Sequence, residues 1–246
     1  MINGLYSAGT AMESSVRQHE LIAQNLANAQ MPGYRRQSIR HASMEHHFDD
    51  DLRNAVQFQA MGTSSQEIMT DFSSGVMEKT GHPFDVAIEG NGFFVIDGPS
   101  GPLYTRNGVF QVDSEGRIVT ADNLPVQGKG GDITIPADTS TASIHIDGEG
   151  RVFAGNMEIG QLDIVSFADP NRLTRSGATL FEAPADMRPQ ESDAQILQGS
   201  RERANVTPVQ ELVEMIAAQR RQEAAQKSMS LLIESLGKHI NVQGRA

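Results

Sequence analysis

The densest group of metal-ligand side chains lies in the segment HASMEHHFDDD. It offers imidazoles at His41, His46 and His47, together with Glu45 and the three carboxylates of residues 49–51. Zinc and other divalent ions accept such ligands. The spacing nevertheless matches neither H-E-x-x-H nor an EF-hand loop. A solvated acidic connector explains the segment, so we predict no metal site and no cofactor.

Other side chains with chemical potential lie in turns. EGNGFF places Gly90 and Gly92 like the start of a dinucleotide loop, but it lacks the third glycine and the following helix. Acidic loops at Asp113, Asp147 and Glu149 would suit calcium, yet hairpin turns use the same residues. There is no cysteine, no G-x-S-x-G, and no carboxylate pair spaced for acid–base chemistry. We expect neither an enzyme nor a small-molecule substrate.

The overall charge argues against nucleic acid as a partner. The 246 residues include 31 acidic and 20 basic side chains, a formal net charge of −11. Binding to nucleic acid or to anionic membranes needs an excess of Lys and Arg. The start, MINGLYSAGTAMESS, lacks the basic and apolar parts of a signal peptide. The default expectation is a cytoplasmic chain, unless it leaves by a route that cleaves no signal.

Apolar residues recur near heptad spacing between residues 3 and 29. The residues on these lines include Leu5, Met12, Ile22 and Leu26. Such a narrow stripe is typical of a coiled-coil seam, so we predict an N-terminal helix that pairs with another helix. Pro32 disfavours the helical conformation for the residue before it, and Gly33 permits a positive φ. The helix must therefore stop before the turn formed by Pro32, Gly33 and Tyr34.

A second helix is predicted near the C-terminus. Thr207, Pro208 and Gln210 fill the N-cap, first and third positions of a capping box. We expect the helix to run to about residue 236, where Gly237 can end it. Its seam includes Leu212, Met215, Ile233 and Leu236. Polar side chains interrupt the seam at Gln219, Gln222 and Gln226. They must be paired or face water, because a buried unpaired amide costs about 1 to 3 kcal/mol.

Between residues 84 and 182 the periodicity changes to two. Short β-branched or aromatic runs alternate with Gly, Asn, Asp and Pro. About eight such runs predict a compact all-β domain, either a barrel or a sandwich. Within it DSEGRIVTADN is echoed by DGEGRVFAGNM, which predicts two hairpins with the same tight turn and an outward arginine, Arg117 and Arg151.

These segments together predict an α+β fold. The four parts are an N-terminal helix in 1–34, an extended connector in 35–80, a β domain in 81–196 and a C-terminal helix in 197–246. A seam between only two helices leaves part of each apolar stripe in water. We therefore expect the two terminal helices to pair as a coiled-coil-like hairpin that becomes fully ordered on assembly.

Three motifs in the same order resemble the bacterial flagellar hook and basal-body rod proteins. They are LIAQNLANAQMPGYRRQ, then FDVAIEGNGFFVI with LYTRNGVFQVDSEGRIV, then ANVTPVQELVEMIAAQRRQE. The resemblance implies that the terminal helices form the inner layer of a hollow helical filament and that the β domain lies outside it. It also implies export by the flagellar type III apparatus without signal cleavage, into a rod that spans the periplasm at the basal body.

The resemblance makes the expected role specific. It implies a structural subunit of the rod, a drive shaft that transmits torque and passes exported subunits, with copies of itself, other rod subunits and adjacent axial proteins as partners. The eight seam residues named above would form subunit interfaces, and the three glutamines would face the channel or bridge subunits. Length and a single β domain are closest to the proximal-rod type. A distal rod or hook subunit is the alternative.

Two positions depart from the family pattern. Met31 stands where the family usually has Thr before Pro-Gly, and Gln222 stands where an aromatic residue usually precedes the glutamate. Neither change removes the helix or its stop, but both alter a local packing partner.

A different class of function also fits the residues alone. It is a secreted β-domain module that binds glycan or peptidoglycan and uses its helices only to dimerise.

Overall fold

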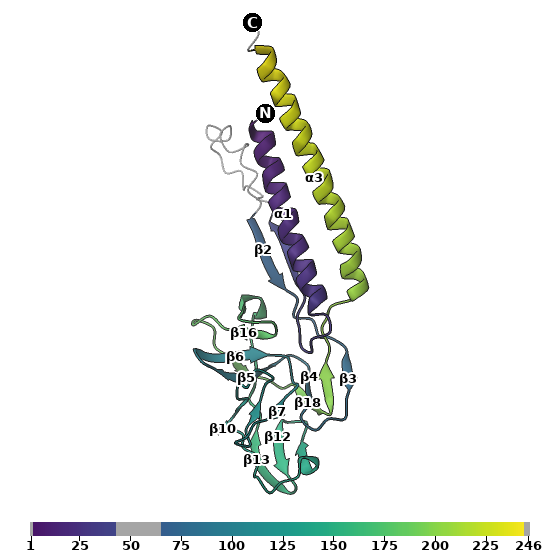
Figure 1. Ribbon diagram of the computed structural model, residues 1–246. Coiled ribbons are helices and arrows are strands. Elements are labelled where there is room, and N and C mark those ends of the chain that lie inside the picture. The colour runs from purple at the N-terminus through teal and green to yellow at the C-terminus, as the bar shows by residue number, and fades with distance from the viewer. Residues whose placement is uncertain (1, 43–64, 244–246) are drawn as a thin grey trace. The chain divides into compact units, whose positions relative to one another are not determined.

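The computed structural model describes residues 2–42 and 65–243, which fall into two compact units (Figure 1). The described parts of the helical unit are 2–27, 37–42, 65–70 and 207–243, and those of the β unit are 28–36 and 71–206. The chain therefore passes between the two units at four places. Of the HASMEHHFDDD segment, all residues after Ala42 lie outside the described residues.

Two long helices dominate the helical unit. Helix α1 spans Ile2–Ala27 and helix α3 spans Pro208–Gln243. They contact each other and run in opposite directions (Figure 1). The stop of α1 before Pro32 and the start of α3 at Pro208 confirm the predicted ends. The helix was wrongly expected to end at Gly237. It continues through this glycine, whose cost of about 1 kcal/mol inside a helix does not suffice to stop it.

The described ends of the expected connector form a two-stranded antiparallel ribbon. Strand β1 spans Gln37–Ala42 and strand β2 spans Ser65–Thr70, in a register that pairs Gln37 with Thr70. An isolated ribbon of two strands is marginally stable in water, so it needs a packing surface. Strand β1 contacts α1, which provides such a surface within the same unit.

The largest sheet of the β unit is antiparallel and open. Its strand order is β15-β16-β6-β5-β14-β17. The bounds are β5 Phe93–Gly98, β6 Gly101–Thr105, β14 Ile164–Ser166, β15 Thr174–Arg175, β16 Leu180–Glu182 and β17 Gln190–Glu191. In the part of the chain that the structure describes, no sheet closes into a barrel, so that alternative was wrong. The short edge strands β15 and β17 leave the sheet open on both sides.

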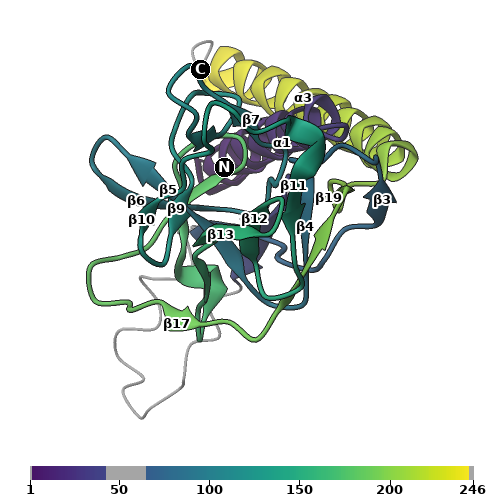
Figure 2. The same cartoon turned by 90° about the horizontal axis from the view of Figure 1, so that it is seen from below.

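The remaining strands form smaller antiparallel sheets. Strands β11, β12 and β13 lie side by side in one of them (Figure 2). The bounds are β3 Met77–Lys79, β4 Val86–Glu89, β7 Gln111–Val112, β8 Ile118–Val119, β9 Gln127–Gly128, β10 Gly131–Asp132, β11 Ile144–Ile146, β12 Arg151–Ala154, β13 Met157–Gln161, β18 Gln195–Gln198 and β19 Ser200–Glu202. Two short 3-10 helices span Thr141–Ser143 and Pro170–Arg172.

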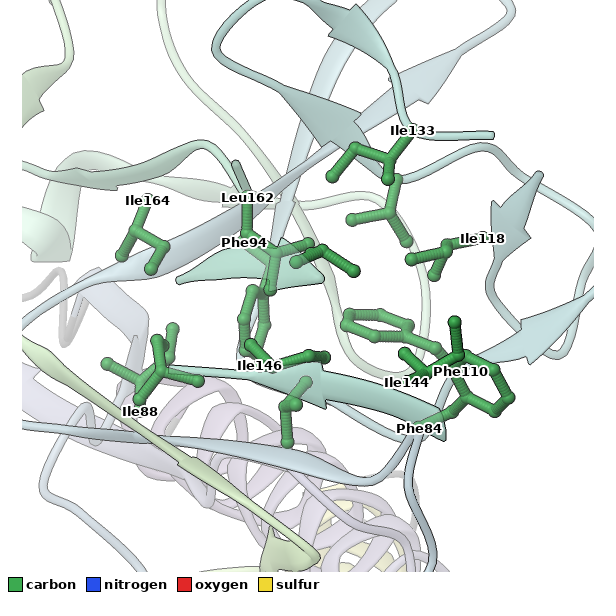
Figure 3. Packing of buried hydrophobic residues seen from close by; sticks show 14 of the residues in the cluster. Phe84, Ile88, Phe94, Phe110, Ile118, Ile133, Ile144, Ile146, Leu162 and Ile164 are labelled. Carbon is green, nitrogen blue, oxygen red and sulfur yellow. The ribbon is translucent and has the colours of Figure 1, made fainter. Parts of the chain in front are cut away.

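Strand β5 separates two apolar cores. Phe94 and Ile96 belong to the larger core. There the rings of Phe94 and Phe110 (Figure 3) meet edge to face, with their centroids 5.1 Å apart. Phe93 and Val95 belong to a second, aromatic cluster with Tyr104, Phe167 and Phe181. Alternate side chains of a strand point to opposite faces. The run FFVI is continuously apolar because both faces of the strand are covered.

The repeated sequence forms two matching hairpins. Strands β7 and β8 join through residues 113–117, and β11 and β12 through 147–150. In each turn the glycine has a positive φ, +82° at Gly116 and +79° at Gly150. Each glycine donates its N–H to the carbonyl of the aspartate that opens the turn, at 3.1 and 3.0 Å. The predicted pair of identical turns is confirmed.

Candidate functional site

One face of α3 is buried along a heptad line. Its buried and half-buried positions are Glu211, Met215, Ala218, Gln222, Ala225 and Met229. Ala218 is fully buried, and its carbonyl oxygen accepts a hydrogen bond from Ser15 Oγ of α1 at 3.5 Å. Small side chains at a helix contact shorten the distance between the two axes. Close approach to α1 therefore shapes this face more than large apolar side chains do.

Asn25 joins three elements of the helical unit. Its side chain is 1% exposed, and its Nδ2 donates to the carbonyl oxygen of Gln37 at 2.8 Å. The N–H of Gln37 donates to Asn25 Oδ1 at 2.9 Å, so the amide meets the backbone of β1 as a neighbouring strand would. Asn25 Nδ2 also lies 3.4 Å from Glu211 Oε2 on α3. The end of α1 is thereby fixed to both β1 and the start of α3.

The opposite face of α3 carries an exposed apolar stripe. At 3.6 residues per turn, Val213 lies on the side of the helix away from Gln222. The stripe consists of Val209, Leu212, Val213 and Ile216, which are 70%, 47%, 62% and 52% exposed. Large apolar side chains that gather on one exposed face mark an interaction surface more often than isolated ones do. We call these four residues the α3 stripe.

The predicted seam residues fall into different environments. Ile22 is buried, whereas Met12, Leu26 and Met215 are half-buried. Leu212 and Ile233 are exposed, at 47% and 53%. The side chains of Leu5 and Leu236 lie outside those that the structure describes. Of the glutamines, Gln222 is half-buried on the buried face, while Gln219 and Gln226 are exposed.

Sequence reasoning missed the contacts of Asn25 and the burial of Glu211. Glu211, Ala218 and residue 225 are seven positions apart, which is a heptad signal. A search for large apolar residues does not detect this heptad line, because it consists of a carboxylate and two alanines. For Asn25 the local sequence offers no comparable signal, since its partners are 12 and 186 positions away.

The turn after α1 belongs to the β unit. Gly33 has a φ of +69°, which confirms the predicted positive value, and an added Cβ would meet the backbone of Asn107. Tyr34 is fully buried and clusters with Ala29 and Val206. Met31, the departure from the family pattern, is 36% exposed. The turn is therefore held by the glycine backbone and the tyrosine ring, and a large part of Met31 stays in solvent.

The acidic turns use their carboxylates internally. Asp113 Oδ1 accepts from the N–H groups of Glu115 and Arg117, both at 2.9 Å, and Oδ2 accepts from Arg117 Nε at 2.9 Å. Asp147 repeats the pattern with Arg151, whose Nε donates at 2.8 Å. Burial acts to raise the pKa of Asp113, but these hydrogen bonds and the charge of Arg117 outweigh it and lower the pKa. Each turn is thus a self-contained ionic hairpin.

The described residues contain neither a cluster of metal ligands nor a helix suited to cross a membrane. Within residues 2–42 and 65–243, no three His, Asp or Glu side chains come together as metal ligands would. Neither described helix is long and apolar enough to cross a membrane.

Comparison with known proteins gave a consistent result. Residues 87–154 match the model described as the flagellar hook protein FlgE/F/G D1 domain, and residues 197–241 match the flagellar basal body rod FlgEFG protein C-terminal model. The chain is 33% identical to the flagellar basal-body rod protein FlgF of Caulobacter vibrioides, over 93% of both chains. It is 31% identical to FlgG of Bacillus subtilis over 99% of this chain and 100% of that protein. It is 30% identical to FlgF of Salmonella typhimurium over 97% of each.

Proposed function

The chain belongs to the family of flagellar basal-body rod proteins, and we propose that it works as a rod subunit whose terminal helices assemble through the α3 stripe. The stripe is the observation that carries this proposal. One face of α3 already contacts α1, and the stripe lies on the opposite face. Among the described residues of the helical unit the stripe stays exposed, and in a rod a further copy or a neighbouring rod subunit would cover it.

The energetics favour such an assembly. Complete burial of a Val, Leu or Ile side chain stabilises by about 1.5 to 3 kcal/mol relative to full exposure. The four stripe residues are about half to two-thirds exposed, so covering them contributes roughly 1 kcal/mol or more each. Repeated along a rod, such contacts add up. Together with a coiled-coil-like pairing of α1 and α3, they provide the inner layer of a hollow shaft that transmits torque.

The polar residues of α3 take complementary roles in this proposal. Gln219 and Gln226 are exposed, which suits a wet channel or a hydrogen bond to a neighbouring subunit. Gln222 is half-buried on the face that includes Ala218, which suits a bridging contact to a neighbouring subunit better than the channel. Leu5, Met12, Ile22 and Leu26 on α1, with Leu212, Met215, Ile233 and Leu236 on α3, remain the proposed interface set.

The remaining assignments follow from the family. The subunit is exported by the flagellar type III apparatus without a cleaved signal and joins adjacent axial proteins at the basal body. The helices within residues 1–34 and 197–246 form the inner layer, with 35–80 as the connector and 81–196 as the outer domain. The relatives include both FlgF and FlgG at similar identity, 33% and 31%. Length and a single β domain favour the proximal position, with a distal rod or hook subunit as the alternative.

The test places a charge on the stripe. In cells whose only copy of the chain carries Val213→Asp, we expect the number of assembled rods to fall about tenfold or more. The reason is that an unpaired carboxylate buried between subunits is costly. Basal bodies counted by electron microscopy give the readout. The matched control is Val76→Asp in the β unit, where the valine is 71% exposed, and it should assemble normally. Normal rods from the Val213 variant would contradict the proposal.

A further inference from the structure

A single buried carboxylate organises the part of the β unit where the chain enters and leaves. Glu202, the last residue of β19, is 1% exposed. Its Oε1 accepts hydrogen bonds from Arg35 Nη2 at 2.8 Å and from the N–H of Gly75 at 2.7 Å. Its backbone oxygen accepts from the N–H of Gly33 at 2.8 Å. One residue therefore anchors two segments that are more than 100 positions away in the sequence.

The charges around Glu202 do not balance. Arg35 is fully buried, and Arg106 is 4% exposed with its Nη1 3.8 Å from Glu202 Oε2. Burial lowers the pKa of Arg106 to about 10, Glu202 counteracts this and Arg35 adds to it, so the guanidinium stays charged at neutral pH. Among the described residues, nothing accepts a hydrogen bond from Arg35 Nε and Nη1 or from Arg106 Nε. Two buried cations thus depend on one anion.

A neighbouring asparagine ties the same segments together. Asn205 Oδ1 accepts from the N–H of Arg36 at 2.7 Å. Its Nδ2 donates to the carbonyl oxygens of Asp71 and Ser73 at 2.8 and 3.1 Å. The N–H of Asp71 donates in turn to the carbonyl oxygen of Arg36 at 2.8 Å. These contacts close a small hydrogen-bonded ring within the β unit.

These segments adjoin three of the four places where the chain passes between the units, and the fourth lies a few residues before Gly33. The passages fall at 27/28, 36/37, 70/71 and 206/207. We propose that Glu202 is a buried ionic latch, which holds segments 33–36 and 71–75 on the β unit in the unassembled subunit. The positions where the chain leaves the β unit are then fixed before assembly, independently of the conformation of the helices. Arg35, Arg106 and Gly75 are the partners of the latch.

Breaking the latch should loosen these segments alone. Removing one partner of a buried ion pair leaves the other charge buried and unpaired, a larger penalty than the pair's net contribution. In the full-length monomer, Glu202→Gln should speed amide hydrogen exchange at Gly33, Gly75 and Asp71 by at least about a hundredfold. The amides of Ile118 and Val126 in the larger core should change by less than about threefold.

A surface pair on the same strands provides the matched control. Glu78 Oε2 accepts from Arg201 Nε at 3.0 Å, with both side chains about 40% exposed, on β3 and β19. Exposed pairs contribute little, so Glu78→Gln should leave every one of these amides within about threefold of the native rate. If the amides of Gly33, Asp71 and Gly75 exchange as slowly in Glu202→Gln as in the native chain, the proposal is overturned.

A second variant with a smaller expected effect tests the latch even if Glu202→Gln unfolds the core as well. Arg35→Met removes one cation and leaves Glu202 with Arg106 and Gly75. It should speed exchange at Gly33 and Gly75 by about tenfold or more, with the core amides unchanged. Unchanged exchange at those two glycines, or equal acceleration at Ile118, would show that no separate latch exists. Neither measurement requires rods to assemble, so the outcome is independent of the proposed function.

Discussion

The helical unit and the β unit bury their side chains in opposite ways. The β unit has two apolar cores on the two faces of β5, with large side chains such as Phe94 and Phe181 completely buried. In the helical unit Glu211 and Ala218 of α3 are buried and Gln222 is half-buried, while several large apolar side chains of α3 face solvent. In a single chain the β unit thus buries its large apolar side chains, whereas α3 leaves several of its own exposed to solvent.

This difference shows how one chain serves two tasks. A large apolar core makes the β unit stable without partners, because each fully buried large side chain stabilises by about 1.5 to 3 kcal/mol. Helix α3 keeps apolar surface exposed on the α3 stripe. If the stripe is the assembly surface that we propose, stability and assembly reside in separate parts of the sequence, and substitutions can separate them.

The largest expected effect is in the β core. Phe94→Ala should lower the free energy of unfolding of the β unit by about 3 to 5 kcal/mol, because it removes a fully buried ring and leaves a cavity. Urea unfolding followed by circular dichroism measures the change. Val76→Ala, at a site 71% exposed, should cost less than about 0.5 kcal/mol. A small effect at Phe94 would mean that the β unit is not self-sufficient.

A smaller effect is expected where the helical unit meets its ribbon. Asn25→Leu keeps the volume but leaves the N–H and C=O of Gln37 without the amide partner, a loss of about 1 to 3 kcal/mol. Amide exchange at Gln37 should become faster, and strand β5 should not change. Glu20→Leu, at an exposed position of the same helix, serves as the control. Unaltered exchange at Gln37 would show that the ribbon is held in another way.

The smallest effect concerns the twin hairpins. The pKa values of Asp113 and Asp147 are both lowered, since hydrogen bonds from the turn and from Arg117 and Arg151 outweigh desolvation. A carboxyl whose pKa is lower in the folded state stabilises above its unfolded pKa, and this contribution disappears as pH falls through the folded pKa. The difference in Tm between the native chain and Asp113→Asn should therefore shrink below about pH 4. Carboxyl NMR titrations with pKa values at or above 3.8 would contradict it.

The local features of the fold were readable from the sequence. Backbone sterics placed the end of α1 before Pro32 and the start of α3 at Pro208, and the repeated Asp, Gly and Arg pattern gave both hairpins. All of these depend on residues close together in the chain. The open sheet was not predictable in the same way, because short apolar runs such as FFVI do not reveal which strands become neighbours.

Long-range polar contacts could not be predicted either, because the local sequence does not reveal which distant residues become neighbours. Arg35 and Glu202 are separated by 167 positions, and nothing in the residues beside either one marks them as partners. The surroundings of α3 were also hard to read. Apolar counting put Leu212 in the seam, whereas in the single chain it is 47% exposed and the buried line runs through Ala218.

The amide of Asn25 has one more consequence, which concerns misassociation. Backbone groups on the edge of a strand can recruit a strand from another chain and so begin edge-to-edge aggregation. At Gln37 both the N–H and the C=O of that edge are already taken by one side chain. Asn25 closes this point of the ribbon against unwanted strand addition while the helices remain available for ordered assembly.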